Sequence, residues 1–177
     1  MKIVIFSDSH GDVETMCGVV EKEKPDMIIY LGDGIEDADQ LNKKYPDIPM
    51  IKNLGNMDSE KEDEEWIKFA EICGKRFIMT HGHTFINEFK NYQQTDENRI
   101  TSRISMLKSM AENNADILLH GHTHDPYISK IPTPARICWI MNPGSIRRVE
   151  GKIFKPTYGV LKISKSGALE WQFVEVE

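Results

Sequence analysis

Carboxylate, amide and imidazole side chains recur in five short segments of this chain, each directly after an apolar run. The segments are Asp8-Ser9-His10, Gly32-Asp33, Gly55-Asn56-Met57-Asp58, His81-Gly82-His83 and His120-Gly121-His122-Thr123-His124. All six histidines of the protein fall in three of them, which a random scatter of structural histidines would rarely produce. Such side chains bind divalent cations of borderline or hard character. The segments therefore predict a metal centre.

Two features of these segments favour a shared site. In an extended segment residues i and i+2 point to the same side, so Asp8 with His10, and His122 with His124, can each aim two donor atoms at one place. The glycines at positions 32, 55, 82 and 121 permit unusual backbone angles and a close approach of the chain to an ion. Because no cysteine lies in the segments, a thiolate zinc site or an iron–sulfur cluster is disfavoured.

The apolar runs before the segments have the length of β-strands. In the first third of the chain, helical patterns separate the runs, and Asp12 is placed to cap the first helix. The expected elements are strands at Lys2–Phe6, Met27–Leu31 and Pro49–Leu54, a helix over residues 13–20 and a helix over Ile35–Tyr45. This order predicts parallel strands with right-handed crossovers. Because ligands bind outside the carboxyl ends of parallel strands, distant segments can meet there.

The rest of the chain is richer in strands. Glu65–Ile72 and Lys75–Thr80 predict a hairpin around Cys73-Gly74. Five further strands are expected at Asp116–Leu119, Tyr127–Ile131, Arg136–Met141, Tyr158–Ile163 and Leu169–Val176. With helices outside two packed sheets, the fold expected is an α/β protein (α+β by some schemes), a four-layer αββα sandwich of two mixed β-sheets flanked by helices.

One long helix and one loop lie in the middle of the chain. A helix from about Asp96 to Asn113 is expected to carry its buried face on Ile100, Ile104, Leu107 and Ala111. Before it, Phe85–Asn98 has no clear period and predicts a loop over the site. Its aromatic residues Phe85, Phe89 and Tyr92 are candidates for substrate contact, or for packing in a lid or subunit contact.

Composition fits a single small domain. The 177 residues show no composition shift, so we expect one domain over residues 1–177. A net charge of -6 with scattered Lys and Arg disfavours a nucleic-acid substrate. The N-terminal apolar run is too short for a signal peptide or a membrane span, and three unpaired cysteines fit buried thiols, so we expect a cytoplasmic protein without membrane contact. The oligomeric state stays open, a homo-oligomer included.

Jointly, the five segments resemble the calcineurin-like metallophosphoesterase superfamily. Its pattern is Asp-x-His, Gly-Asp, Gly-Asn-His-Asp or Glu, a His-Gly element and Gly-His-x-His. The small size, the Gly-Asn-x-Asp form and the later Asn142-Pro143-Gly144-Ser145 look most like the small bacterial and archaeal phosphodiesterase subfamily, to which the eukaryotic retromer subunit is related. The resemblance runs from residue 3 to about residue 145. Any one motif alone is unspecific, but the set is highly specific.

The resemblance implies a phosphodiesterase that acts on a small phosphate ester with two divalent cations and a hydroxide that bridges them. Manganese is the ion we expect, and zinc, iron, nickel and magnesium are alternatives that this donor set accepts. Asp33 would bridge both ions, and Asp33 and Asn56 are predicted as catalytic residues as well as ligands. The ligands that the resemblance implies are Asp8, His10 and His124 for the first metal, and Asn56, His81 and His122 for the second.

One position departs from the family pattern. Where many relatives have a histidine after Gly-Asn, this chain has Met57, whose thioether cannot donate a proton to a leaving alkoxide. We therefore expect esters with activated leaving groups to react best, or His83 or solvent to supply the proton. His83 is accordingly a catalytic candidate, with a hydrogen-bonded loop residue as the alternative. Asp58 is expected to orient a ligand or a loop.

Other functions and roles stay open. A non-catalytic protein-binding scaffold on the same fold would have lost ligands, whereas all seven positions here hold competent residues. A nuclease is disfavoured by the acidic balance, the short chain and Met57. We interpret His120 as a packing residue at a strand end, Asn142–Ser145 as a turn that can border the site, and Arg147-Arg148 as surface charge.

Overall fold

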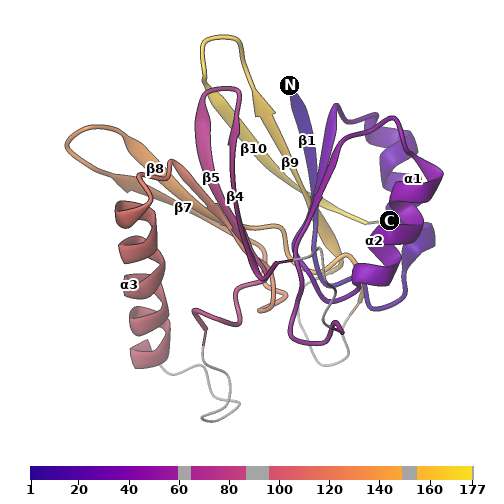
Figure 1. Cartoon of the computed structure of the whole chain (residues 1–177), viewed down its shortest axis with the longest axis horizontal. Coiled ribbons are helices and arrows are strands. Elements are labelled where there is room, and N and C mark those ends of the chain that lie inside the picture. Colours follow the sequence, from indigo (N-terminus) through magenta and orange to yellow (C-terminus); the bar gives the residue numbers. More distant parts are fainter. Residues whose placement is uncertain (60–64, 87–95, 149–154, 177) are drawn as a thin grey trace.

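The computed structural model describes residues 1–59, 65–86, 96–148 and 155–176, which form two facing β-sheets with helices on both outer sides (Figure 1). The first sheet has five strands in the order β10-β9-β1-β2-β3. Its strands are β1 (Lys2–Phe6), β2 (Met27–Tyr30), β3 (Met50–Lys52), β9 (Thr157–Ile163) and β10 (Leu169–Glu175). β1, β2 and β3 are parallel, as expected, and are connected by α1 (Val13–Glu23) and α2 (Ile35–Lys44).

The second sheet also has five strands, in the order β4-β5-β6-β8-β7. Its strands are β4 (Ile67–Ile72), β5 (Lys75–Thr80), β6 (Ile117–Leu119), β7 (Tyr127–Pro132) and β8 (Ile137–Asn142). β4 and β5 form the predicted antiparallel hairpin, in which Ile72 pairs with Lys75. β5, β6 and β8 are parallel, and α3 (Asp96–Glu112) precedes β6.

Three clusters of buried apolar side chains pack the sheets and helices together as layers. One cluster lies between the sheets and joins Ile29 of β2 to Leu119 of β6. A second packs α1 and α2 against the first sheet through side chains such as Val20, and a third packs α3 against the second sheet through Met110. Burial of these apolar faces from both sides of each sheet is the main source of stability. The arrangement confirms the expected α/β class and the four-layer αββα sandwich.

The predicted start of α1 agrees with the structure, whereas the predicted buried face of α3 does not. Asp12 caps α1 as predicted, because its carboxylate accepts a hydrogen bond from the Thr15 backbone N–H at 3.1 Å. The predicted buried face of α3 is wrong. Met106 and Met110 are buried against the second sheet, whereas Ile100 and Ile104 are 59% and 60% exposed.

Several smaller expectations concern α3, the cysteines and a membrane span. Ala111 of α3 is also exposed, and Leu107 is half-buried at the edge of the α3 cluster. Cys17 and Cys138 are buried as expected, but Cys73 is exposed in the turn between β4 and β5. Among the residues described, no helix combines the length and the apolar character needed to cross a membrane.

Candidate metal centre

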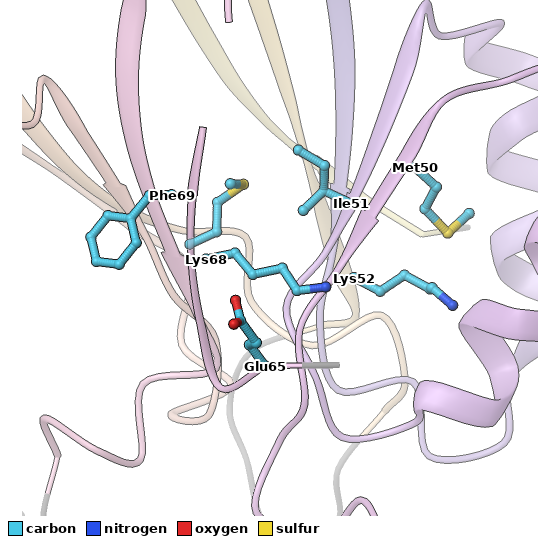
Figure 2. Close-up of a pocket in the computed structure, with 7 residues that line it drawn as sticks. Met50, Ile51, Lys52, Glu65, Lys68 and Phe69 are labelled. Carbon is cyan, nitrogen blue, oxygen red and sulfur yellow. The ribbon is translucent and has the colours of Figure 1, made fainter. Parts of the chain in front are cut away.

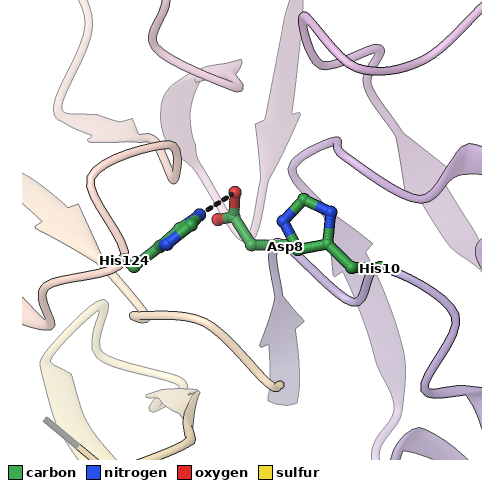
Figure 3. A group of neighbouring side chains, drawn as sticks. All are labelled: Asp8, His10 and His124. Atoms are coloured by element: carbon green, nitrogen blue, oxygen red, sulfur yellow. Dashed lines mark hydrogen bonds and ion pairs between the residues drawn. The ribbon is translucent and has the colours of Figure 1, made fainter. Parts of the chain in front are cut away.

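Six of the expected ligands form two compact groups. Asp8, His10 and His124 each offer one donor atom, and these three atoms lie within 4.8 Å of one another. Asp8 and His10 follow β1, and His124 follows β6, so the loops after two strands of different sheets meet here. Figure 3 shows the Asp8 carboxylate between the two imidazoles, with His124 Nε2 at 3.1 Å from Asp8 Oδ1.

The second group consists of Asp33, His81 and His122, again with donor atoms within 4.8 Å of one another. His81 Nε2 lies 3.3 Å from Asp33 Oδ2 and 3.1 Å from His122 Nδ1. The two groups are adjacent, because His81 Nε2 is also 3.8 Å from Asp8 Oδ1 and the His122 backbone N–H donates to Asp8 Oδ2 at 3.1 Å. The structure thus brings six of the seven predicted ligands to one place.

The backbone that carries these ligands is not extended, so that part of the spacing argument was wrong. Asp8, His10, Asp33, His122 and His124 all have a left-handed backbone, with φ between 43° and 68°. Each such residue costs about 1–3 kcal/mol, and strain of this kind concentrates at functional sites. The turns also send neighbouring side chains apart: His122 points to the second group and His124 to the first.

Two glycines allow the loops to approach this closely. A Cβ on Gly55 would overlap the Asp33 backbone nitrogen and its carboxylate, and a Cβ on Gly121 would overlap Ser7 Oγ and the Asp8 carboxylate. The sequence singled out both glycines for a close approach of the chain to an ion, and the structure shows instead that they let two loops pack against each other. Only glycine therefore fits at these two positions, because the loops pack too closely to leave room for a Cβ.

Asp58 orients the loop that carries Asp33, as expected. Its carboxylate accepts backbone hydrogen bonds of 2.9 Å from Asp33, 2.7 Å from Gly34, 2.8 Å from Ile35 and 2.8 Å from Gly55. The carboxylate also lies at the N-terminus of α2, where negative charge is favourable. Asp58 thereby fixes two of the five segments relative to each other.

Asn56 and Met57, which belong to the same segment as Asp58, are exposed to solvent. Asn56, the seventh expected ligand, is exposed in the turn after Gly55. Met57 is 71% exposed, so its thioether does not pack in the core, while its backbone N–H donates to Asp33 Oδ1 at 2.8 Å.

Burial and charge set the protonation of the two groups. Burial alone would raise the pKa of Asp8, but the hydrogen bond from His124 and the charge of His81 bring that pKa below its ordinary value. Burial opposes ionisation of Asp33 in the same way, and His81 again lowers its pKa. For His81 burial lowers the pKa, yet Asp33 and Asp8 raise it above the ordinary value. His122, buried beside the charge of His81, has its pKa lowered to about 4.

Hydrogen bonds fix the tautomer of one ligand. His81 Nδ1 lies 2.8 Å from the Leu31 carbonyl oxygen, so it donates there and leaves Nε2 directed at both carboxylates. A backbone carbonyl that holds the second ring nitrogen is the usual support of a metal-binding histidine.

The other two histidines lie beside the groups. His120 is fully buried and its Nε2 contacts the Tyr127 hydroxyl, which confirms its role as a packing residue at a strand end; burial lowers its pKa to about 4. The His83 ring packs at a tilt against the Trp66 ring with centroids 4.4 Å apart, and its own centroid lies 5.6 Å from that of His81. Phe85 packs against the α3 cluster, whereas Phe89 and Tyr92 lie outside the described residues.

The end of β8 and the turn after it hold the ligand loops together. Asn142 Nδ2 donates to the Gly121 carbonyl and to Thr123 Oγ1, each at 2.9 Å, and so supports the loop that carries His122 and His124. Ser145 Oγ donates to the Asp8 carbonyl at 2.9 Å, and the Arg147 guanidinium donates to the His10 carbonyl. The turn predicted at residues 142–145 therefore borders the site. The interpretation of Arg147 as simple surface charge was incomplete.

A buried network below His10 was not foreseen. Ser9 Oγ lies 2.5 Å from the Tyr30 hydroxyl and 2.6 Å from Asp37 Oδ2, which also accepts the Gly11 N–H at 2.7 Å. Asp37 lies in the first turn of α2, and the sequence pattern predicted only that it is part of a helix. The network fixes the turn between Asp8 and His10.

The donor set fits divalent cations. Two carboxylates buried next to each other and among imidazoles are costly unless positive charge compensates them. Among the described residues, His81 Nε2 lies 3.8 Å from Asp8 Oδ1 and 3.3 Å from Asp33 Oδ2. Oxygen and imidazole donors suit manganese, zinc, iron and magnesium. The two groups are thus suited to divalent metal ions, and their geometry does not distinguish among these ions.

A separate hollow of about 310 Å³ opens between β3 and β4, the edge strands of the two sheets (Figure 2). It is lined by Met50, Ile51, Lys52, Glu65, Lys68, Phe69 and Met79. None of these residues belongs to either group, so the hollow is not the place where the carboxylates and imidazoles act.

Comparisons with known proteins find similarity to phosphoesterases. A probable metallophosphoesterase of Mycoplasma pneumoniae is 26% identical over 166 residues, which are 93% of this chain and 91% of that protein. The crystal structure of a predicted phosphoesterase from Streptococcus pneumoniae TIGR4 has a TM-score of 0.68 at 25% identity and covers 98% of this chain and 88% of its own.

A more distant structure shows the same fold. Vps29 from Entamoeba histolytica, crystallised with zinc, has a TM-score of 0.68 at 16% identity over the whole of both chains. The family model of the calcineurin-like phosphoesterase superfamily domain matches residues 1–166. The chain belongs to the calcineurin-like phosphoesterase superfamily.

Proposed function

We propose that this protein is a dinuclear metal-dependent phosphodiesterase that hydrolyses a small phosphate ester. The observation that carries the proposal is the pair of adjacent ligand groups, Asp8–His10–His124 and Asp33–His81–His122. When bound, two divalent cations activate a water molecule as the nucleophile and stabilise the charge that develops on the phosphoryl oxygens. Manganese is the ion we propose, and a reducing, cytoplasmic location accords with the free cysteines.

The side chains have separate tasks in this proposal. Each group holds one cation, and Asn56 completes the second set from the rim. Asp33 bridges the groups: its carboxylate faces His81, its carbonyl oxygen accepts the His10 N–H at 3.3 Å, and His10 contributes to the lowering of its pKa. A shared carboxylate offsets positive charge from both cations, which lie about 3.5–4 Å apart in two-metal sites.

His83 is the proposed contact to the ester at the second group. Burial and the charge of His81 lower the pKa of His83, so its imidazole is neutral near pH 7 and donates a hydrogen bond rather than a full proton. Because Met57 donates no proton either, esters with activated leaving groups should react fastest. A plot of log kcat against leaving-group pKa across an aryl ester series tests this point, and a flat plot contradicts it.

Hydrolysis of bis(p-nitrophenyl) phosphate tests the main proposal. We expect activity with added Mn²⁺, loss of activity with a chelator, and a loss of at least about a hundredfold in Asp33→Asn, which removes the bridging charge. Lys52→Gln, which changes a charge in the separate hollow, serves as the matched control and should keep its activity. A folded, metal-loaded protein without any hydrolysis contradicts the proposal and favours a binding scaffold.

A further inference from the structure

Two exposed apolar side chains stand at the rim of the second group. Trp66, directly before β4, is 40% exposed, and Met57 is 71% exposed. Exposed indole and thioether groups are unexpected beside a centre made of carboxylates and imidazoles, because such a centre by itself attracts only ions. Their position suggests that the molecule bound there has an apolar part.

Trp66 differs from the other two tryptophans of the chain. Trp139 and Trp171 pack against the cluster between the sheets, whereas Trp66 belongs to none of the three core clusters. Its burial therefore contributes little to the core, and its large exposed face has no structural explanation within the described residues. Ligand sites are lined mostly by apolar and aromatic side chains around a few polar groups, and Trp66 has such a position beside the second group.

His83 connects Trp66 to the ligand groups. The Trp66 and His83 rings are 4.4 Å apart at an interplanar angle of 55°, and the His83 ring lies 6.1 Å from that of His122. Both ring nitrogens of His83 are shielded from water and have no hydrogen-bond partner among the described residues. Because buried polar atoms are normally satisfied, a bound molecule is the natural source of that partner.

We propose that Trp66, supported by His83, is the specificity-determining residue that binds the organic substituent of the ester, and that the substrates carry a flat aromatic group such as an aryl ring or a nucleobase. The inference rests on the proposed function and names its substrate class. The phosphoryl group lies at the two ligand groups, His83 donates a hydrogen bond next to it, and the ring stacks on the indole. Stacking of this kind accepts any flat π-system.

Two phosphonates that cannot be hydrolysed separate stacking from phosphoryl binding. Methylphosphonate and benzylphosphonate share the anionic group and differ in the aromatic ring. Titration calorimetry of the Mn²⁺-loaded protein should show benzylphosphonate binding about tenfold tighter than methylphosphonate. In Trp66→Leu this ratio should fall to about two, with the affinity for methylphosphonate unchanged, while Trp66→Phe should keep most of the preference.

A matched control lies in β4, the strand that follows Trp66. Phe69 of β4 is 58% exposed and lines the separate hollow, so Phe69→Leu should leave the ratio of affinities as in the unmodified protein. If methylphosphonate binds and the ratio is unchanged in both Trp66 variants, the inference is wrong and the proposed function stands. If neither phosphonate binds the metal-loaded protein, both are wrong.

Discussion

At the scale of single residues, Asp58 shows how one side chain can organise a site without belonging to it. Its carboxylate accepts four backbone hydrogen bonds from the two loops that carry Asp33 and Asn56. These bonds join segments that are more than twenty residues apart in the chain. The arrangement of the second ligand group therefore depends on a residue that is not itself a member of the group.

We expect Asp58→Ala to lower the free energy of unfolding by about 2–4 kcal/mol, because several backbone N–H groups lose a charged acceptor. Asp58→Asn keeps one acceptor oxygen and should lose about half as much. Urea denaturation in the presence of chelator measures both losses without any contribution from metal binding. Equal stability of all three proteins would show that water replaces the carboxylate at no cost.

His120 makes stability depend on pH. Burial lowers its pKa to about 4, below the ordinary value of 6.5, so the unfolded chain binds a proton between these values that the folded protein does not. The contribution of His120 to the free energy of unfolding is therefore fully present above about pH 6.5 and is lost as the pH falls towards 4. The loss attributable to His120 is roughly 3 kcal/mol.

A comparison with His120→Asn isolates this contribution, because the pKa of His122 is lowered to about 4 as well and adds a similar loss in both proteins. Unfolding free energies measured in chelator at pH 7 and pH 4.5 should differ more for the unmodified protein than for the variant. The same pH dependence in both would contradict the role given to His120.

At the scale of elements, the loops after β1, β2, β3, β5 and β6 carry the site, and their glycines set how closely they pack. Gly55→Ala should destabilise the protein by about 1–3 kcal/mol and weaken metal binding, because its Cβ would overlap Asp33. Gly18→Ala is the matched control: Gly18 lies in α1 with nothing near its would-be Cβ, so alanine should stabilise by about 0.5–1 kcal/mol. Thermal unfolding and Mn²⁺ titration of both variants measure these effects.

Strands and helices could be predicted because their patterns are local, but the face of α3 could not. Ile100 and Ile104 are spaced for one helical stripe and Met106 and Met110 for another, and both stripes are apolar. Only the position of the second sheet decides that the methionines are buried. The left-handed backbone at Asp8 and at the other ligands could not be predicted either, since it depends on contacts with distant loops.

At the scale of the whole molecule, the two sheets face each other so that loops from both meet at one centre. Residue types and their positions after apolar runs predicted six of the side chains that meet there, because parallel strands present their following loops at the same edge. The sequence predicted that the turn at residues 142–145 can border the site, but neither the hydrogen bonds of Asn142 and Ser145 nor the role of Asp37 could be predicted, because a single buried polar residue carries no signal of its partner. The sequence therefore predicts the ligands better than it predicts the residues that hold them in place.

The most direct test of this account is the number of metal ions bound per chain. Equilibrium dialysis against Mn²⁺, followed by elemental analysis of the folded protein, should give two ions per chain for the unmodified protein. A protein that stays folded and binds no manganese, or binds a single ion per chain at saturation, would contradict the dinuclear centre on which the proposed function depends.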